Sequence, residues 1–146
     1  MLVAGSQASE FNPREGWRII ETDHTYALLV DRLKASIRAE KMGLVTQASA
    51  SDGARMNGIT IPGNRVLGVY RNDYARRMLA ASVAAGIEAP IRFYVTEHPD
   101  GSARLSWKTP SFVFAPYMPE GGAALETLAA ELDTVFETIA AGAIGK

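Results

Sequence analysis

The chain has 146 residues, a length that favours one domain with its own hydrophobic core. Its formal net charge of -1 gives no field that would attract nucleic acid or an acidic membrane surface. The absence of cysteine excludes disulfides, thiolate metal sites and thiol nucleophiles, and two histidines cannot form a three-histidine site within one chain. With no signal-peptide pattern in residues 1–10 and no apolar run of about 20 residues, we expect a soluble, cytoplasmic protein without metal or cofactor.

The beginning of the chain is rich in small and polar residues. We expect residues 1–15 to form a loose N-terminal segment and residues 16–146 to form a single domain. The β-prone run at residues 17–21 predicts a first strand. Apolar side chains at spacings of three and four predict a helix over residues 24–42, with Gly43 at its C-terminal end.

The middle of the chain predicts two strands and a second helix. A strand at residues 44–48 is followed by a Gly-, Ser- and Pro-rich connection over 49–63, which holds at most one short helical turn. The nearly continuous apolar run at 65–70 predicts a central strand covered on both faces. Gly68 weakens this strand unless something packs close to its backbone. Helical spacing then predicts a helix over residues 72–86.

The last third of the chain predicts a hairpin and a final helix. Alternation of apolar and polar residues at 91–96 and 104–108 indicates two strands joined by a tight turn. Three prolines keep residues 109–122 from forming a central strand, although 112–114 could pair briefly. An apolar stripe predicts a helix over about 123–141. The order β-α-β-β-α-β-β-α favours an α+β fold, with about five strands in one mixed or antiparallel sheet and helices packed on it.

Three segments of the chain resemble the domain-of-unknown-function 302 family. They are KMGLVTQAS at 41–49, RVLGVYRNDYARRML at 65–79 and IRFYVTEHPDGSARLSWKTP at 91–110, and the resemblance spans residues 17–141. It implies a compact α+β domain, often a stand-alone bacterial protein, with no settled activity. Family members often carry cysteines at positions corresponding to 68–71 and 88–91. This chain lacks them, so a thiol or metal role proposed for such relatives does not transfer.

Arginines around the second predicted helix are candidates for an anion site. Arg71 precedes the helix, where backbone N–H groups can hold a phosphate or carboxylate, and Arg65 lies nearby in the sequence. Asp73, however, occupies the same first turn and would repel an anion. The alternative is a solvated basic face, or pairing of these arginines with the acidic side of the last helix.

The other titratable candidates are weaker. His24, at the start of the first predicted helix, could act as a catalytic base, but nothing in the sequence identifies its partner. His98 belongs to a turn and is expected to be an ordinary surface residue. Glu88, Glu97 and Asp100 are explained by exposed loops rather than by paired-carboxylate catalysis. Motifs typical of nucleotide binding, zinc proteases and α/β-hydrolases are absent from the sequence.

The segment from 107 to 118 combines aromatic side chains, a methionine and two prolines. Such a segment could form one wall of an apolar pocket or an oligomer interface, and a proline-stiffened segment loses little entropy on binding. The alternative is that it closes one end of the sheet as part of the core. The candidate ligand-binding residues are Trp107, Phe112, Phe114, Tyr117 and Met118.

Three hypotheses about function follow from these patterns. The first, which we favour, is a non-catalytic binding or accessory module, expected to be a homodimer, whose apolar surface is built from the hairpin and the 107–118 segment. Its ligand would be a small apolar molecule there or a small anion at Arg65 and Arg71. The second is an enzyme for a small molecule that uses His24 or the Arg65/Arg71 region. The third is a subunit that acts only by covering a partner protein. The enzyme hypothesis predicts that at least two of the side chains of His24, Arg65 and Arg71 meet in one concave site.

Overall fold

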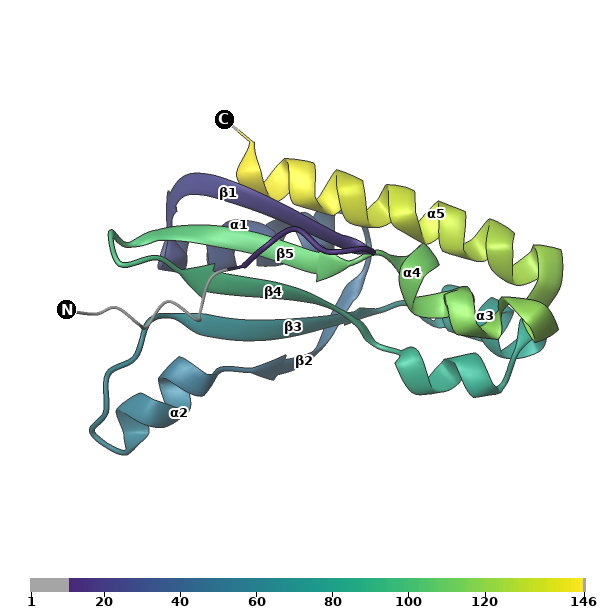
Figure 1. Ribbon diagram of the computed structural model, residues 1–146, viewed down its shortest axis with the longest axis horizontal. Coiled ribbons are helices and arrows are strands. Elements are labelled where there is room, and N and C mark those ends of the chain that lie inside the picture. The colour runs from purple at the N-terminus through teal and green to yellow at the C-terminus, as the bar shows by residue number, and fades with distance from the viewer. Residues whose placement is uncertain (1–10, 146) are drawn as a thin grey trace.

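The computed structural model describes residues 11–145 and shows an α+β fold, as the sequence predicts. Its single sheet has five strands in the order β1-β5-β4-β3-β2, and every neighbouring pair is antiparallel. In Figure 1 the helix α5 runs along the sheet, and α3 and α4 lie at the end opposite the β4–β5 turn. No helix of the described residues is long and apolar enough to cross a membrane.

The elements follow one another as the hydrophobic periodicity indicates, with two short helices added. The strands are β1 (Trp17–Thr25), β2 (Gly43–Ala48), β3 (Asn64–Tyr70), β4 (Ile91–Glu97) and β5 (Ser102–Lys108). The α-helices are α1 (Tyr26–Ala39), α2 (Ala50–Met56), α3 (Asn72–Ala81), α4 (Pro110–Phe114) and α5 (Met118–Ile144). Two 3₁₀ helices, η2 (Ala84–Glu88) and η3 (Ala115–Tyr117), follow α3 and α4.

The structure corrects the first half of the sequence prediction at three points. The strand β1 continues to Thr25, whose side chain accepts the N–H of Leu28, so α1 begins later than predicted. The helix α1 also ends earlier than predicted. The left-handed residue after it is Lys41 (φ 62°), and not Gly43, which the prediction placed at the end of the helix. The connection 49–63 contains a seven-residue helix rather than one short turn.

Two further corrections concern the second half. The helix α3 ends at Ala81 instead of near residue 86, because the chain turns into η2. Residues 110–117 are helical and do not pair as a strand. The predicted start of the last helix agrees with a break at Gly122 (φ 59°, ψ -152°), after which α5 is regular. The expectation of a loose terminus over residues 1–15 lies mostly outside the described residues.

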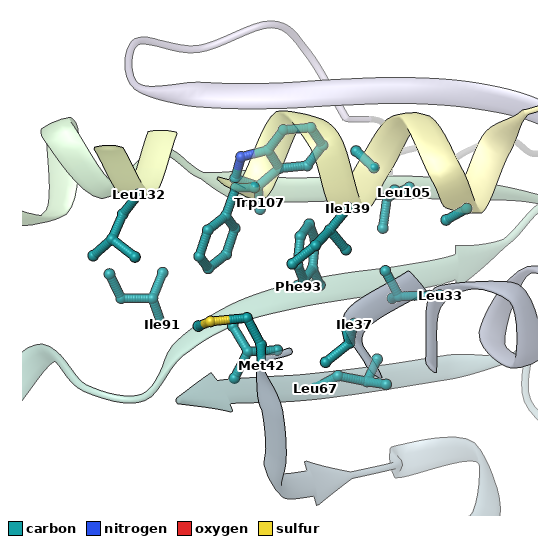
Figure 2. Packing of buried hydrophobic residues seen from close by; sticks show 14 of the residues in the cluster. Leu33, Ile37, Met42, Leu67, Ile91, Phe93, Leu105, Trp107, Leu132 and Ile139 are labelled. Carbon is teal, nitrogen blue, oxygen red and sulfur yellow. The ribbon is translucent and has the colours of Figure 1, made fainter. Parts of the chain in front are cut away.

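The hydrophobic core lies between one face of the sheet and the helices α1 and α5. Figure 2 shows Phe93 of β4 and Trp107 of β5 beside Ile139 of α5, with Leu33 of α1 on the same side. The ring centroids of Phe93 and Trp107 are 5.4 Å apart, and both side chains are buried. The predicted apolar stripe of α5 is confirmed. Its buried large side chains are Leu125, Leu128, Leu132, Phe136 and Ile139. Burial of this many large side chains is the main stabilising term of such a domain.

Strand alternation leaves the opposite face of the sheet without a covering helix. The register pairs Tyr94 with Ser106 and Ser106 with Ile19, so these three side chains share that face. We call it the open face. Successive side chains of a strand point to opposite sides, so each open-face residue is flanked by two core residues along its own strand. This face positions the candidate site.

Candidate functional site: a groove on the open face

A groove of about 620 Å³ lies where the open face meets the segment after β5. Its floor consists of side chains from four strands, and its wall comes from α4 and η3. The floor residues are Trp17 of β1, Lys108 of β5, Arg92 and Tyr94 of β4, and Asn64 and Val66 of β3. The wall residues are Phe112, Val113, Ala115 and Pro116, with Glu88 of η2 beside them. The volume and mixed lining are typical of a small-molecule site.

The wall is fixed in place by local sequence. Thr109 caps α4 by accepting the N–H of Phe112 (3.2 Å). Pro110 follows in the first turn, where its missing N–H costs nothing because a backbone N–H at this position has no partner within the helix. Ser111 donates its backbone N–H (2.9 Å) and its hydroxyl to Asp133 of α5. The helix α4 is therefore tied to the core helix, and its groove side is held rigidly.

Phe112 closes the groove by packing against backbone. Its ring lies over Gly16, where a Cβ atom would come within 2.1 Å of the ring, and Gly16 also has a positive φ of 81°. The carbonyl of Gly16 accepts the N–H of Thr109 (2.8 Å). A glycine is required at this position both for its conformation and for the close approach of the ring.

The part of the open face next to the groove is covered by Phe11. Its ring stacks on Tyr94 (6.0 Å between centroids) and meets Trp17 edge to face (5.9 Å). The guanidinium of Arg104 lies 4.5 Å from the centre of the same ring. Aromatic and cation–π contacts of this kind contribute about 0.5–1.5 kcal/mol each. Phe11 therefore borders the groove on the side of the β4–β5 turn.

The charges that line the groove are mainly positive. Arg92 and Lys108 both line it, and the ammonium of Lys108 lies 5.8 Å from the centre of the Trp17 ring. Glu88 is the acidic lining residue, and it accepts a hydrogen bond from the hydroxyl of Tyr117 (2.5 Å). This bond, followed by burial, raises the pKa of Tyr117 above its ordinary value.

The aromatic candidates from the 107–118 segment fall in different environments. Trp107 and Phe114 are buried in the core, and Met118 packs partly against it. Tyr117 does not line the groove, and its hydroxyl donates a hydrogen bond to Glu88, which does. Phe112 alone among the five presents an exposed ring that lines the groove. Trp107 also borders the groove, but its alternation with Lys108 directs its indole into the core.

The arginine candidates are held by neighbouring carboxylates. Arg65 donates to Asp52 (2.5 Å) and to the side-chain oxygen of Gln47 (3.0 Å). Arg71 donates twice to Asp73 (2.7 and 3.1 Å), and this hydrogen bonding raises the pKa of Arg71 and lowers that of Asp73. Arg71 also borders a small, mostly apolar cavity of about 40 Å³ beside the core.

Pairing with the acidic side of the last helix is confirmed for one arginine of the predicted cluster. Arg77 donates two hydrogen bonds of 2.8 Å to Glu131 of α5. Both side chains are about half exposed, so this ion pair contributes at most about 1 kcal/mol. It connects α3 to α5 without contributing to the groove.

The two histidines lie at the turn end of the sheet, away from the groove wall. His24 is the penultimate residue of β1, and the antiparallel order places the end of β1 opposite the end of β3, where Arg71 lies. His98 is hydrogen bonded to Glu21 (2.6 Å), which also accepts from Arg104 (2.8 Å). Burial alone would raise the pKa of Glu21, but these two partners lower it below its ordinary value.

Sequence reasoning did not single out the floor of the groove. Arg92, Tyr94 and Lys108 were recognised only as the polar side of two alternating strands. The signal that could have found them is the hairpin register, because alignment of the two strands around their turn puts these residues together on one face. Among residues 11–145, no three His, Asp or Glu side chains gather as they would around a metal ion.

Comparison with known proteins identifies the family and adds no activity. The family model described as "Domain of unknown function DUF302" matches residues 18–139. The fold is similar to the crystal structure of an uncharacterized conserved protein DUF302 from Bacillus stearothermophilus, with a TM-score of 0.74 and 17% sequence identity. This match covers 86% of the present chain and 96% of the other, and no curated protein matches. The family match, over nearly all of the sheet and helices, shows that the chain belongs to the DUF302 family.

Proposed function

We propose that the protein is a non-catalytic binding module that holds a small organic molecule in the groove on its open face. The observation that supports this most directly is the groove itself, which combines an apolar wall at Phe112, Val113 and Pro116 with aromatic and polar floor residues. Because the wall is anchored to α5 through Ser111 and Asp133, little conformational entropy is lost when a ligand binds.

The arrangement of titratable groups favours binding over catalysis. An enzyme that uses His24 with Arg71 would need them in one concave site, but they lie at opposite ends of the sheet. Arg65 is engaged by Asp52, and neither His24 nor Arg65 lines the groove or the 40 Å³ cavity. Inside the groove, the acid Glu88 is bound by Tyr117 and has no base beside it among the lining residues.

Filling the groove tests this function. Ala115 is an exposed lining residue with helical backbone, so Ala115→Phe adds a ring to the groove without strain in the fold. We expect the variant to lose about tenfold or more in affinity for 1-anilinonaphthalene-8-sulfonate, followed by its fluorescence. Ala80→Phe, at an exposed position of α3, is the matched control and should bind as the unmodified protein does.

Native mass spectrometry of gently purified protein gives an independent test. A small added mass in the unmodified protein that is missing from Ala115→Phe supports the groove as the site. Equal dye binding by both proteins, with unchanged thermal unfolding, would contradict the proposed function.

A homodimer is the assembly that we propose for the module. The strand β2 is an edge of the sheet and most of its residues are exposed, and exposed apolar side chains occur on it at Val45 and in the segment that follows it at Met56 and Ile59. A second copy could pair antiparallel with this edge. Sedimentation at micromolar concentration should show a dimer that Val45→Lys converts to monomer. A monomer for the unmodified protein would contradict this assembly.

A further inference from the structure

Two cationic residues occupy opposite backbone positions on neighbouring strands and both line the groove. The β4–β5 register pairs Phe93 with Trp107, so the next residues along, Arg92 and Lys108, lie opposite one another. Phe93 and Trp107 point into the core, and alternation therefore directs Arg92 and Lys108 to the open face, where both line the groove. Like charges directly opposite each other on a sheet destabilise it unless something neutralises them.

Many arginines elsewhere in the chain are neutralised by carboxylates. Six form ion pairs: Arg18, Arg55, Arg65, Arg71, Arg77 and Arg104. Others are held by neutral oxygens, as Arg32 is by the carbonyl of Ala143 and Arg76 by the side chain of Asn72. Within residues 11–145, Arg92 and Lys108 make no such pair, and Lys108 instead lies over the ring of Trp17. The carboxylate that lines the same groove, Glu88, accepts the hydroxyl of Tyr117.

The apolar lining lies next to this pair of cations. Trp17 is opposite Lys108 in the β1–β5 register, and Tyr94 follows Arg92 by two residues on the same face. Phe112, Val113 and Pro116 supply the adjoining wall. A molecule that fills the groove therefore meets a lining that contains two positively charged residues on neighbouring strands, with apolar or aromatic surface beside them.

We propose that Arg92 and Lys108 bind the carboxylate of a small organic acid whose apolar body lies against the wall and the aromatic floor. The inference rests on the proposed binding function and names its ligand class. A carboxylate can accept hydrogen bonds from a guanidinium and an ammonium together, and charge-assisted bonds of this kind are stronger than neutral ones. Its negative charge also removes the repulsion between the two cations, so the charged head adds affinity beyond burial of the body.

Three compounds with one body and different heads test the ligand class: 4-phenylbutyrate, 4-phenylbutanol and 4-phenylbutylamine. We expect the carboxylate to bind about tenfold tighter than the alcohol, measured by calorimetry, and the amine to bind weakest. Raising the salt concentration should weaken binding of the carboxylate and leave that of the alcohol nearly unchanged.

Substitutions locate the anionic head. Arg92→Gln and Lys108→Gln should each lower the affinity for 4-phenylbutyrate about fivefold or more, without changing that for 4-phenylbutanol. Arg92→Lys keeps the charge and should retain part of the affinity. Arg38→Gln, at an exposed position of α1, is the matched control for loss of one positive charge and should bind as the unmodified protein does.

The possible outcomes separate this inference from the function on which it rests. If the three compounds bind equally well and Ala115→Phe abolishes their binding, the groove is a ligand site but the carboxylate assignment is overturned. A carboxylate preference that persists in both Arg92→Gln and Lys108→Gln overturns the assignment as well. If none of the compounds binds at millimolar concentration, and the dye binds Ala115→Phe unchanged, both proposals fail.

Discussion

Gly68, in the middle of β3, shows how one residue determines local packing. A Cβ atom at this position would lie 2.1 Å from the hydroxyl oxygen of Thr46 and 2.9 Å from the ring of Pro90. The side chains of Thr46 and Pro90 therefore pack close to the backbone of Gly68, which is the condition under which a glycine is expected in a central strand. Because β2 and Pro90 both cover this glycine, a side chain here cannot be accommodated without displacing one of them.

We predict that Gly68→Ala lowers the free energy of unfolding by about 1–3 kcal/mol, because the added methyl group overpacks the contact with Thr46. Thr46→Ala removes the nearest atom, so the double variant should recover part of the loss in chemical denaturation. Gly53→Ala is the matched control, since a Cβ there meets nothing within 4 Å and alanine favours the helix α2. A Gly68→Ala variant as stable as the control would contradict this account of the packing.

At the scale of elements, a small polar cluster joins β1 to the β4–β5 hairpin. Glu21 accepts hydrogen bonds from His98 (2.6 Å) and Arg104 (2.8 Å), and the Arg104 side chain is only 10% exposed. The hydroxyl of Thr22 donates to the carbonyl of Ala103 (2.7 Å) beside them. The cluster lies where the β1–β5 register shifts between Glu21 and Thr25, so it secures the edge strand where ladder hydrogen bonding is interrupted.

Loss of this carboxylate should change stability in a pH-dependent way. The pKa of Glu21 is lowered in the folded protein, so its stabilising contribution is complete above the ordinary glutamate pKa and disappears as pH falls through the lowered value. Glu21→Gln should therefore cost about 0.5–1 kcal/mol at pH 7 and nothing below the lowered pKa.

Thermal unfolding from neutral to acidic pH measures this difference. Glu126→Gln, at an exposed position of α5, controls for the general loss of a negative charge. A Glu21→Gln difference that stays constant across the pH range would show that the carboxylate contributes only by packing.

The elements that the sequence predicted correctly are those whose side-chain period is determined locally. The hairpin was found because Ile91, Phe93 and Val95 alternate with polar residues and the turn residues follow at once. The end of α1 was misplaced because the left-handed conformation there belongs to Lys41, which propensity does not favour. The helix α4 was missed because the prolines of 109–122 were considered only as obstacles to a central strand, although proline suits a first helical turn.

The candidate site was less predictable because its parts come from distant segments. The packing of Phe112 on Gly16 joins residues that no local pattern relates, and the same holds for Phe11 on Tyr94. Aromatic content alone made Trp107 and Phe114 candidate ligand-binding residues, with closure of the sheet as the alternative, and both side chains are buried in the core. The exposed candidate, Phe112, differs from them only in which side of α4 it occupies.

At the scale of the whole molecule, and within residues 11–145, the helices α1 and α5 pack on one face of the sheet, and a short helical segment and Phe11 lie on the other. An antiparallel sheet can expose one face to water, so this arrangement needs no second layer for stability. The core face carries the hydrophobic burial, and the open face is free to carry aromatic and charged groups. The groove at Trp17, Tyr94 and Phe112 occupies the part of that face where the helical wall gives it depth.

The chain's two tryptophans lie on opposite faces of the sheet and provide a direct test of the central claim. Trp17 lines the groove, and the Trp107 side chain is 2% exposed in the core. In proton–nitrogen NMR spectra, titration with 4-phenylbutyrate should shift the indole N–H signal of Trp17 and the backbone signals of Lys108 and Val113, while the indole signal of Trp107 stays nearly fixed. Shifts confined to α1 or β2, or no shifts at saturating ligand, would contradict a binding site on the open face.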